Sequence, residues 1–177
     1  MSRIPTHTVE DAPAASRPFL QDLIRSSPTG RFLNAHAQMA HSPAVLAAYT
    51  SLRAVIAERG TLDPKVGWAL NLATAATVGN DYMIGIAGRF ARMSGWTEAQ
   101  ISALRAGTTT GDPKIDALTG LVREAAANSG NVTDVVWKAA QQGGWSDEQL
   151  AEAFAYLGLT VFTGYFLNYA QTDMDAS

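Results

Sequence analysis

The chain has 177 residues, a length that fits one domain, and 47 % of them are hydrophobic, which is enough for a sizeable core. Its net charge is −3, and its lysines and arginines are scattered singly, so neither a nucleic-acid partner nor an anionic membrane surface is expected. The sequence contains no cysteine. Disulfide scaffolds, thiolate metal sites and thiol redox chemistry within the chain are therefore excluded.

The first residues differ in composition from the rest of the chain. Residues 1–13 are rich in proline, threonine and alanine, which predicts a flexible N-terminal arm before a single helical domain over residues 14–175. Residues 1–10 lack a basic start followed by an apolar run, so no secretory signal is expected. The expected location is therefore the cytoplasm.

Helix starts are the clearest local signals along the chain. A helix is expected over residues 14–25, followed by a turn cluster at 26–30 and a short helix over 31–41. A capping side chain precedes proline three times, beginning at Ser42, Asp63 and Asp112. Each pair is typical of an N-cap with proline in the first helical position. The three helices that follow are expected to end near the glycines at 60, 79 and 130.

Two similar helix entries lie further along. The break at Gly79 precedes a helix that Asn80 or Asp81 caps and that ends at Gly95. Residues 95–101 (GWTEAQI) and 144–150 (GWSDEQL) each place a tryptophan before a capping box. Similar helix entries are the simpler interpretation, and a duplicated unit is the alternative. No alternating run of strand length occurs, so the predicted fold class is all-α.

The segment 150–170 is apolar and close to the length of a membrane span. It nevertheless carries Glu152, Thr160, Thr163 and Asn168, and no basic anchor flanks it. A buried central helix or an interface helix is therefore expected, rather than a membrane partner.

Five segments in chain order resemble a known superfamily. They cover residues 38–49 (QMAHSPAVLAAY), 60–63 (GTLD), 95–107, 112–118 (DPKIDAL) and 165–175 (YFLNYAQTDMD). Together they resemble the peroxidase-related branch of the alkyl hydroperoxidase D-like (AhpD-like) and carboxymuconolactone decarboxylase superfamily. The resemblance implies a single-domain AhpD-like helical bundle that forms a homo-oligomer, as a dimer, trimer or hexamer.

The redox site of that superfamily is missing here. The family carries Cys-x-x-Cys at a helix start, a His four residues after the second Cys, and a Glu about three turns upstream. The resemblance places Asn80 and Met83 at the two Cys positions, Ala87 at the His and Trp68 at the Glu, with Tyr82 between the two Cys positions. Hydroperoxide reduction by the family mechanism is therefore excluded, because no group at these positions can carry its electrons.

Three residues are candidates for proton transfer, and each has a structural alternative. Tyr82 and Asp81 lie at the expected helix start, where Asp81 can instead serve only as a cap. Imidazole ordinarily titrates near neutrality, which makes His41 a candidate general base, although beside a helix start a histidine more often makes a structural hydrogen bond. His36 and His41 are five residues apart and share no helix face well, so neither a metal site nor a cofactor is expected.

Six further residues are candidates for contacts with a small-molecule ligand. They are Trp68, Asn80, Met83, Arg89, Tyr165 and Asn168. The helix start at Asn80 offers backbone N–H groups to a carboxylate, and Arg89 offers a positive charge. The structural alternatives are core filling for Trp68 and Met83, capping for Asn80 and a surface pair with Asp81 for Arg89. Tyr165 and Asn168 can instead join helices.

Three functions fit these residues and the resemblance. The first is a cofactor-independent enzyme of lyase, decarboxylase or isomerase type acting on a small organic acid or lactone-like molecule, which the decarboxylase branch of the superfamily implies. The second is a non-catalytic binding protein that keeps the helical pocket. The third is an oligomeric structural protein, which is compatible with either of the others.

Overall fold

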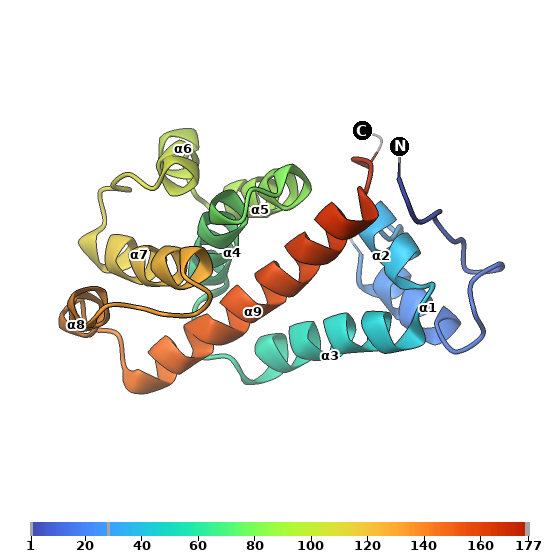
Figure 1. Ribbon diagram of the computed structural model, residues 1–177, viewed down its shortest axis with the longest axis horizontal. Coiled ribbons are helices and arrows are strands. Elements are labelled where there is room, and N and C mark those ends of the chain that lie inside the picture. The colour runs from blue at the N-terminus through green and yellow to red at the C-terminus, as the bar shows by residue number, and fades with distance from the viewer. Residues whose placement is uncertain (1, 28, 176–177) are drawn as a thin grey trace.

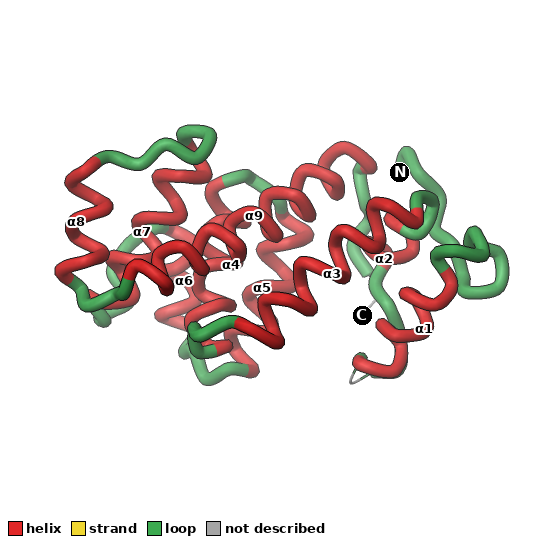
Figure 2. Tube along the Cα trace, turned by 90° about the horizontal axis from the view of Figure 1, so that it is seen from below, coloured by secondary structure: helices red, strands yellow, loops and turns green. Residues whose placement is uncertain are grey.

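The computed structural model describes residues 2–27 and 29–175, which form nine helices and no strand (Figures 1 and 2). The helices are α1 (Arg17–Ser26), α2 (Asn34–Met39), α3 (Pro43–Arg59), α4 (Pro64–Thr77), α5 (Asp81–Met93), α6 (Glu98–Ala106), α7 (Pro113–Ala127), α8 (Asp134–Gln142) and α9 (Asp147–Ala170). The all-α prediction is confirmed.

Side-chain caps fix the helix starts that the sequence predicted. Ser42 accepts the Val45 amide at the start of α3, and Asp63 accepts the Lys65 amide at the start of α4. Asp112 accepts the Lys114 and Ile115 amides at the start of α7. Each of these three helices has proline in its first turn. Capping boxes begin α6 and α9 at the two predicted entries. These starts are local, since each satisfies orphan amides within three residues.

Helix α4 lies at the centre of the larger half of the molecule. It packs against α5, α6, α7 and α9, and α8 covers the far side of α7 (Figure 1). Small buried residues on α4, including Gly67, Ala69 and Ala73, permit this close packing. A Cβ at Gly67 would lie 2.5 Å from the Tyr156 ring of α9, so these two helices need glycine at that position.

The smaller half holds α1, α2 and α3 together with both chain ends (Figure 1). The Arg3 amide donates to the Ala170 carbonyl at 2.8 Å, and the His7 amide donates to the Ala37 carbonyl at 3.2 Å. Ala12 is 1 % exposed. The flexibility predicted for residues 1–13 stays a prediction, and the contacts of residues 2–13 argue against it.

Some helix boundaries differ from the expected ones. Helix α2 begins at Asn34 rather than near residue 31, because the buried His36 ring accepts the Leu33 amide and fixes the start there. Helix α9 begins at Asp147, earlier than the apolar segment suggested, because Ser146 caps it. The sequence did not predict α8, a helix of nine residues that lies on α7 with only Ala140 buried.

The two tryptophan entries belong to a larger repeated arrangement. The Trp96 indole donates to the Lys65 carbonyl at 2.9 Å, and the Trp145 indole donates to the Lys114 carbonyl at 2.8 Å. Each lysine ammonium also lies over the ring of its tryptophan, at 4.8 and 4.5 Å from the centroid. In each pair, the lysine and the tryptophan are 31 residues apart in the sequence. This shared geometry supports the duplicated unit, with α4–α6 matching α7–α9.

Helix α9 crosses the whole molecule and joins its two halves (Figure 1). It packs against α3, α4, α5 and α7. Among the described residues it is the one helix long and apolar enough to cross a membrane by length and composition, which is weak evidence by itself. It contacts four other helices, as a central helix would, although only 39 % of its most apolar 18-residue window is buried.

Candidate functional site

The start of α5 is tied to the end of α9 by one buried amide. Asn80 is 3 % exposed, and its Oδ1 accepts the Met83 amide at 2.7 Å, which confirms it as the N-cap. Its Nδ2 donates to the Gly164 carbonyl at 3.1 Å and to Asn168 Oδ1 at 2.6 Å. Asn80 therefore caps one helix and binds another, which positions both at the same place.

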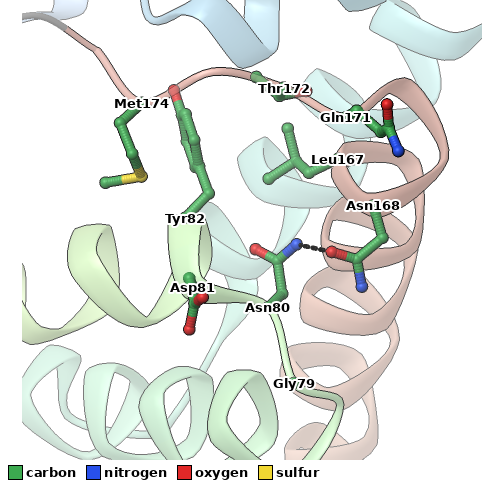
Figure 3. A pocket seen from close by; sticks show the side chains of 9 residues that line it. All are labelled: Gly79, Asn80, Asp81, Tyr82, Leu167, Asn168, Gln171, Thr172 and Met174. Atoms are coloured by element: carbon green, nitrogen blue, oxygen red, sulfur yellow. Dashed lines mark hydrogen bonds between the residues drawn. The ribbon is translucent and has the colours of Figure 1, made fainter. Parts of the chain in front are cut away.

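A pocket of about 480 Å³ opens at this junction (Figure 3). Its walls come from the start of α5, the last turns of α9 and the C-terminal tail over residues 171–175. The lining residues are Gly79, Asn80, Asp81, Tyr82, Leu167, Asn168, Gln171, Thr172 and Met174. Most of these offer polar groups, while Leu167, Met174 and the Tyr82 ring are apolar.

Tyr82 forms one wall of the pocket and points its hydroxyl toward the tail (Figure 3). This hydroxyl donates a short hydrogen bond to the Asp175 carboxylate and accepts the Ala35 amide at 3.4 Å. Burial, and then the bond and negative charge of Asp175, raise the pKa of Tyr82 far above its ordinary value. Tyr82 therefore stays protonated at neutral pH, and its hydroxyl serves as a hydrogen-bond donor rather than in proton transfer.

The tail that closes this side of the pocket is held by side chains of α2. Asp175 accepts the Asn34 amide at 2.7 Å with its other oxygen. The Asn34 side chain donates to the Asp173 carbonyl at 3.1 Å and to the Met174 carbonyl at 3.3 Å. Thr172 Oγ1 donates to the buried Gln38 side chain. These bonds make the tail a fixed wall.

Four of the predicted site residues line the pocket, namely Asp81, Tyr82, Asn80 and Asn168. Asp81 is exposed at the rim, and in Figure 3 its carboxylate points the opposite way from the Tyr82 ring. The backbone N–H groups of Asp81 and Tyr82 lie in the first turn of α5 and make no hydrogen bond within the described part of the chain. They are free donors for a negatively charged oxygen.

Two of the predicted residues lie among other structural contacts. His41 is exposed, and its Nε2 donates to the Pro5 carbonyl at 2.9 Å while its ring lies 3.9 Å from that of His7. Trp68 stacks on Phe90 with ring centroids 4.5 Å apart and packs against the main core. Neither lines the pocket, so a role in the site stays a prediction for both.

Three more predicted residues also lie outside the pocket lining. Met83 packs in a small apolar cluster with residues of α2 and α9. Arg89 is exposed, and within residues 2–27 and 29–175 it makes no ion pair with Asp81. Tyr165 is 58 % exposed on α9. Their proposed ligand contacts are untested predictions.

The tail residues Gln171, Thr172, Met174 and Asp175 complete the site, and no local pattern in the sequence selected them. The available signal was the resemblance of residues 165–175 to a family ending. In the described part of the chain, no three His, Asp or Glu side chains lie close enough together to hold a metal ion.

Residues 43–124, from α3 into α7, match the model of the carboxymuconolactone decarboxylase family. The resemblance read from the sequence is confirmed, and the chain has the AhpD-like helical fold without a cysteine. No curated protein matches the sequence.

Several solved structures share the whole fold. The AhpD core of a peroxidase-related protein from Ralstonia eutropha JMP134 superposes with a TM-score of 0.84 at 17 % identity, covering 98 % of this chain and 92 % of that one. A peroxidase-related protein from Silicibacter sp. TM1040 gives 0.80 at 11 % identity, covering 99 % and 92 %. A cysteine-to-alanine variant of the debrominase Bmp8 in complex with 2,3,4-tribromopyrrole gives 0.82 at 13 % identity, covering 99 % and 93 %. At these identities the likeness shows the fold.

Proposed function

We propose that the pocket between α5 and α9 binds a small organic acid or lactone-like molecule and that the chain is a cofactor-independent enzyme of lyase, decarboxylase or isomerase type. The observation that carries the proposal is the first turn of α5. It brings an exposed carboxylate on Asp81, a protonated Tyr82 and two free backbone N–H groups to one pocket.

These groups suit proton transfer next to a carbonyl. The Asp81 carboxylate would take a proton from the substrate carbon, and the negative charge that develops on the substrate oxygen would be held by the first-turn N–H groups. Tyr82 lines the same pocket without exchanging protons, because its raised pKa makes it a weak acid and its hydroxyl proton is bonded to Asp175. Isomerisation would use the same proton, because Asp81 would return it to a different carbon of the substrate.

The fold neighbour that holds 2,3,4-tribromopyrrole supports a small-molecule pocket in this fold. For the present chain, the ligand class follows instead from the polar lining and the free N–H donors. Cytoplasmic location and the absence of nucleic-acid and membrane partners belong to the same proposal.

A second candidate function, ligand binding without turnover, has its own supporting observation. The Tyr82 hydroxyl is already bonded to Asp175. The side-chain amide of Asn80 already makes three hydrogen bonds within the fold, to Met83, Gly164 and Asn168. Asp81 then remains the one titratable side chain on the pocket lining that is free to react. Asp81 therefore decides between an enzyme and a binding protein.

The test combines ligand binding with turnover. Thermal shifts would be measured with small carboxylates, lactones, phenolics and hydroperoxides, since a ligand at 100 times its Kd adds about 2.7 kcal/mol of stability. Each binder would then be followed by proton NMR for exchange or conversion. The enzyme proposal expects conversion that Asp81→Asn lowers by about 100-fold or more, which is the typical contribution of a general base.

Asp134 provides a matched control for this variant. It occupies the first position of α8, as Asp81 does in α5, and it is exposed but lies outside the pocket. Asp134→Asn loses the same favourable interaction with a helix start and should leave turnover unchanged. Binding without conversion by the wild-type protein would establish the binding function instead. Equal turnover in wild type and Asp81→Asn would remove Asp81 from the mechanism.

A further inference from the structure

An uncovered aromatic stripe follows α9 from Ala151 to Tyr169. It consists of Ala151, Phe154, Gly158, Phe162, Tyr165 and Tyr169. At about 100° per residue, these six positions fall within roughly 80° of the helix circumference. Phe154, Tyr165 and Tyr169 are 66 %, 58 % and 70 % exposed, and Phe162 is 39 % exposed. Exposed aromatic residues scattered singly need no explanation, but an unbroken row of them does.

The rest of α9 agrees that one of its faces is open. Only 39 % of its most apolar 18-residue window is buried, although a central helix of a closed domain would be mostly covered. In Figure 1 no other helix lies in front of α9 where it crosses the molecule. The stripe also carries no charge, because residues 153–172 include no Asp, Glu, Lys or Arg.

The pattern of the stripe is symmetric about its central glycine. Four residues before and after Gly158 lie Phe154 and Phe162, and seven residues before and after it lie Ala151 and Tyr165. A two-fold axis through Gly158 would therefore set each Phe154 against a Phe162, and each small Ala151 against a large Tyr165. An isologous contact needs a face that complements itself in this way. A Cβ at Gly158 would meet nothing within 4 Å, so the monomer does not require glycine there.

We propose that α9 pairs antiparallel with α9 of a second copy of this chain, with the two helices crossing at Gly158. Glycine at the crossing allows two helix backbones to approach closely. A neutral face meets its own copy without charge repulsion, whereas a differently charged partner would find nothing on it to pair with. The proposal is independent of what the pocket binds, although Tyr165 and Tyr169 flank the pocket residue Asn168.

The exposed area is sufficient to begin such an interface. Taking about 200 Å² for a fully exposed aromatic side chain, the four aromatic residues present roughly 450 Å² on each copy. A standard-size interface takes about 800 Å² from each partner. The stripe alone supplies more than half of that area, and α3, on which only Leu46 is buried, runs alongside and offers more.

The first test measures mass in solution by sedimentation equilibrium. The wild-type chain is expected at an even multiple of 18.8 kDa. Gly158→Glu is expected to give the 18.8 kDa monomer, because two carboxylates and their stems would meet on the axis. Gly120→Glu is the matched control, since Gly120 is also a helical glycine with nothing within 4 Å of its Cβ, and it should leave the mass unchanged.

The second test locates the axis. Because the chain has no cysteine, Gly158→Cys introduces a single thiol on each copy, and mild oxidation is expected to join two copies by a disulfide. Gly120→Cys under the same conditions should remain uncrosslinked. A wild-type monomer, an assembly that survives Gly158→Glu, or equal crosslinking of the two cysteine variants would each overturn the proposal. A monomer that sediments with phosphatidylcholine vesicles would assign the stripe to lipid and overturn it as well.

Discussion

His36 shows how one buried side chain sets a helix start and carries a pH dependence. It is 6 % exposed, its Nδ1 accepts the Leu33 amide at 3.2 Å, and its Nε2 donates to the Tyr49 hydroxyl at 3.2 Å. Burial, with a smaller contribution from the positive charge of Arg53, lowers the pKa of His36 from 6.5 to about 3. Protonation would also break the bond to Leu33, so the neutral ring belongs to the folded state.

This shift predicts that acid weakens the fold well above the range in which carboxylates titrate. The unfolded chain takes up a proton on His36 below pH 6.5, whereas the folded chain does so only near pH 3. Stability is therefore complete above pH 6.5 and falls as the pH drops toward 3, by about 2 kcal/mol at pH 5. Urea denaturation from pH 7.5 to 5 measures the slope.

His36→Gln is the matching control for that slope. A glutamine at this third position can still accept the Leu33 amide, as in a capping box, but it does not titrate. The unfolding free energy of His36→Gln relative to that of the wild type should therefore rise by about 2 kcal/mol between pH 7.5 and 5. If both proteins lose stability in parallel, His36 does not carry the effect.

A residue of the site could be predicted from the sequence only where its contacts are with residues close to it along the chain. Asn80 was recognised as a cap because its bond to Met83 is local, but its bonds to Gly164 and Asn168 span 84 and 88 residues and leave no periodic trace. Asp175 was missed for the same reason, since its bond to Tyr82 spans 93 residues. His41 was chosen for the chemistry of its side chain, and Trp68 was chosen by alignment with the family. Neither residue lines the pocket.

At the scale of elements, the repeated Trp–Lys pair is a stabilising device used twice. Each indole donates to the carbonyl of the lysine in the first turn of α4 or α7. Trp96 and Trp145 are 5 % and 7 % exposed. Helices with such caps and entries were predictable from short patterns. Helix α8 was not, because its nine residues are fewer than the roughly 11 to 18 over which helical periodicity is usually read.

The repeat predicts equal effects from equal changes. Trp96→Phe and Trp145→Phe each remove one buried N–H···O bond and leave a small cavity, so each should lower the free energy of unfolding by about 2 kcal/mol. The two losses should add in the double variant, because the pairs share no partner. Urea denaturation of the three variants measures this. A loss confined to one tryptophan would show that the second pair is incidental to stability.

At the scale of the whole molecule, the two chain ends brace the smaller half against the larger one. The N-terminal arm bonds to α2 and to the end of α9, and the C-terminal tail runs from α9 past Tyr82 of α5 to the start of α2. Helix packing alone could not have predicted this arrangement, because both segments lack regular structure. The pocket depends on it, since Thr172 and Met174 of the tail form one of its walls.

Asp175 is the point at which this brace can be tested. Asp175→Ala leaves the Tyr82 hydroxyl and the Asn34 amide without their acceptor, and it should lower the free energy of unfolding by about 2 kcal/mol. It should also speed amide exchange at Asn34, because the tail no longer covers the start of α2. Asp173→Ala, which removes the exposed bonds to Ser2, should cost clearly less than Asp175→Ala. If the two variants lose stability equally and exchange at Asn34 is unchanged, the tail is held by its backbone and Tyr82 does not need Asp175. If the expected order holds, any ligand that enters beside Tyr82 meets a wall whose position one carboxylate sets, and the affinity of the pocket should fall together with the stability.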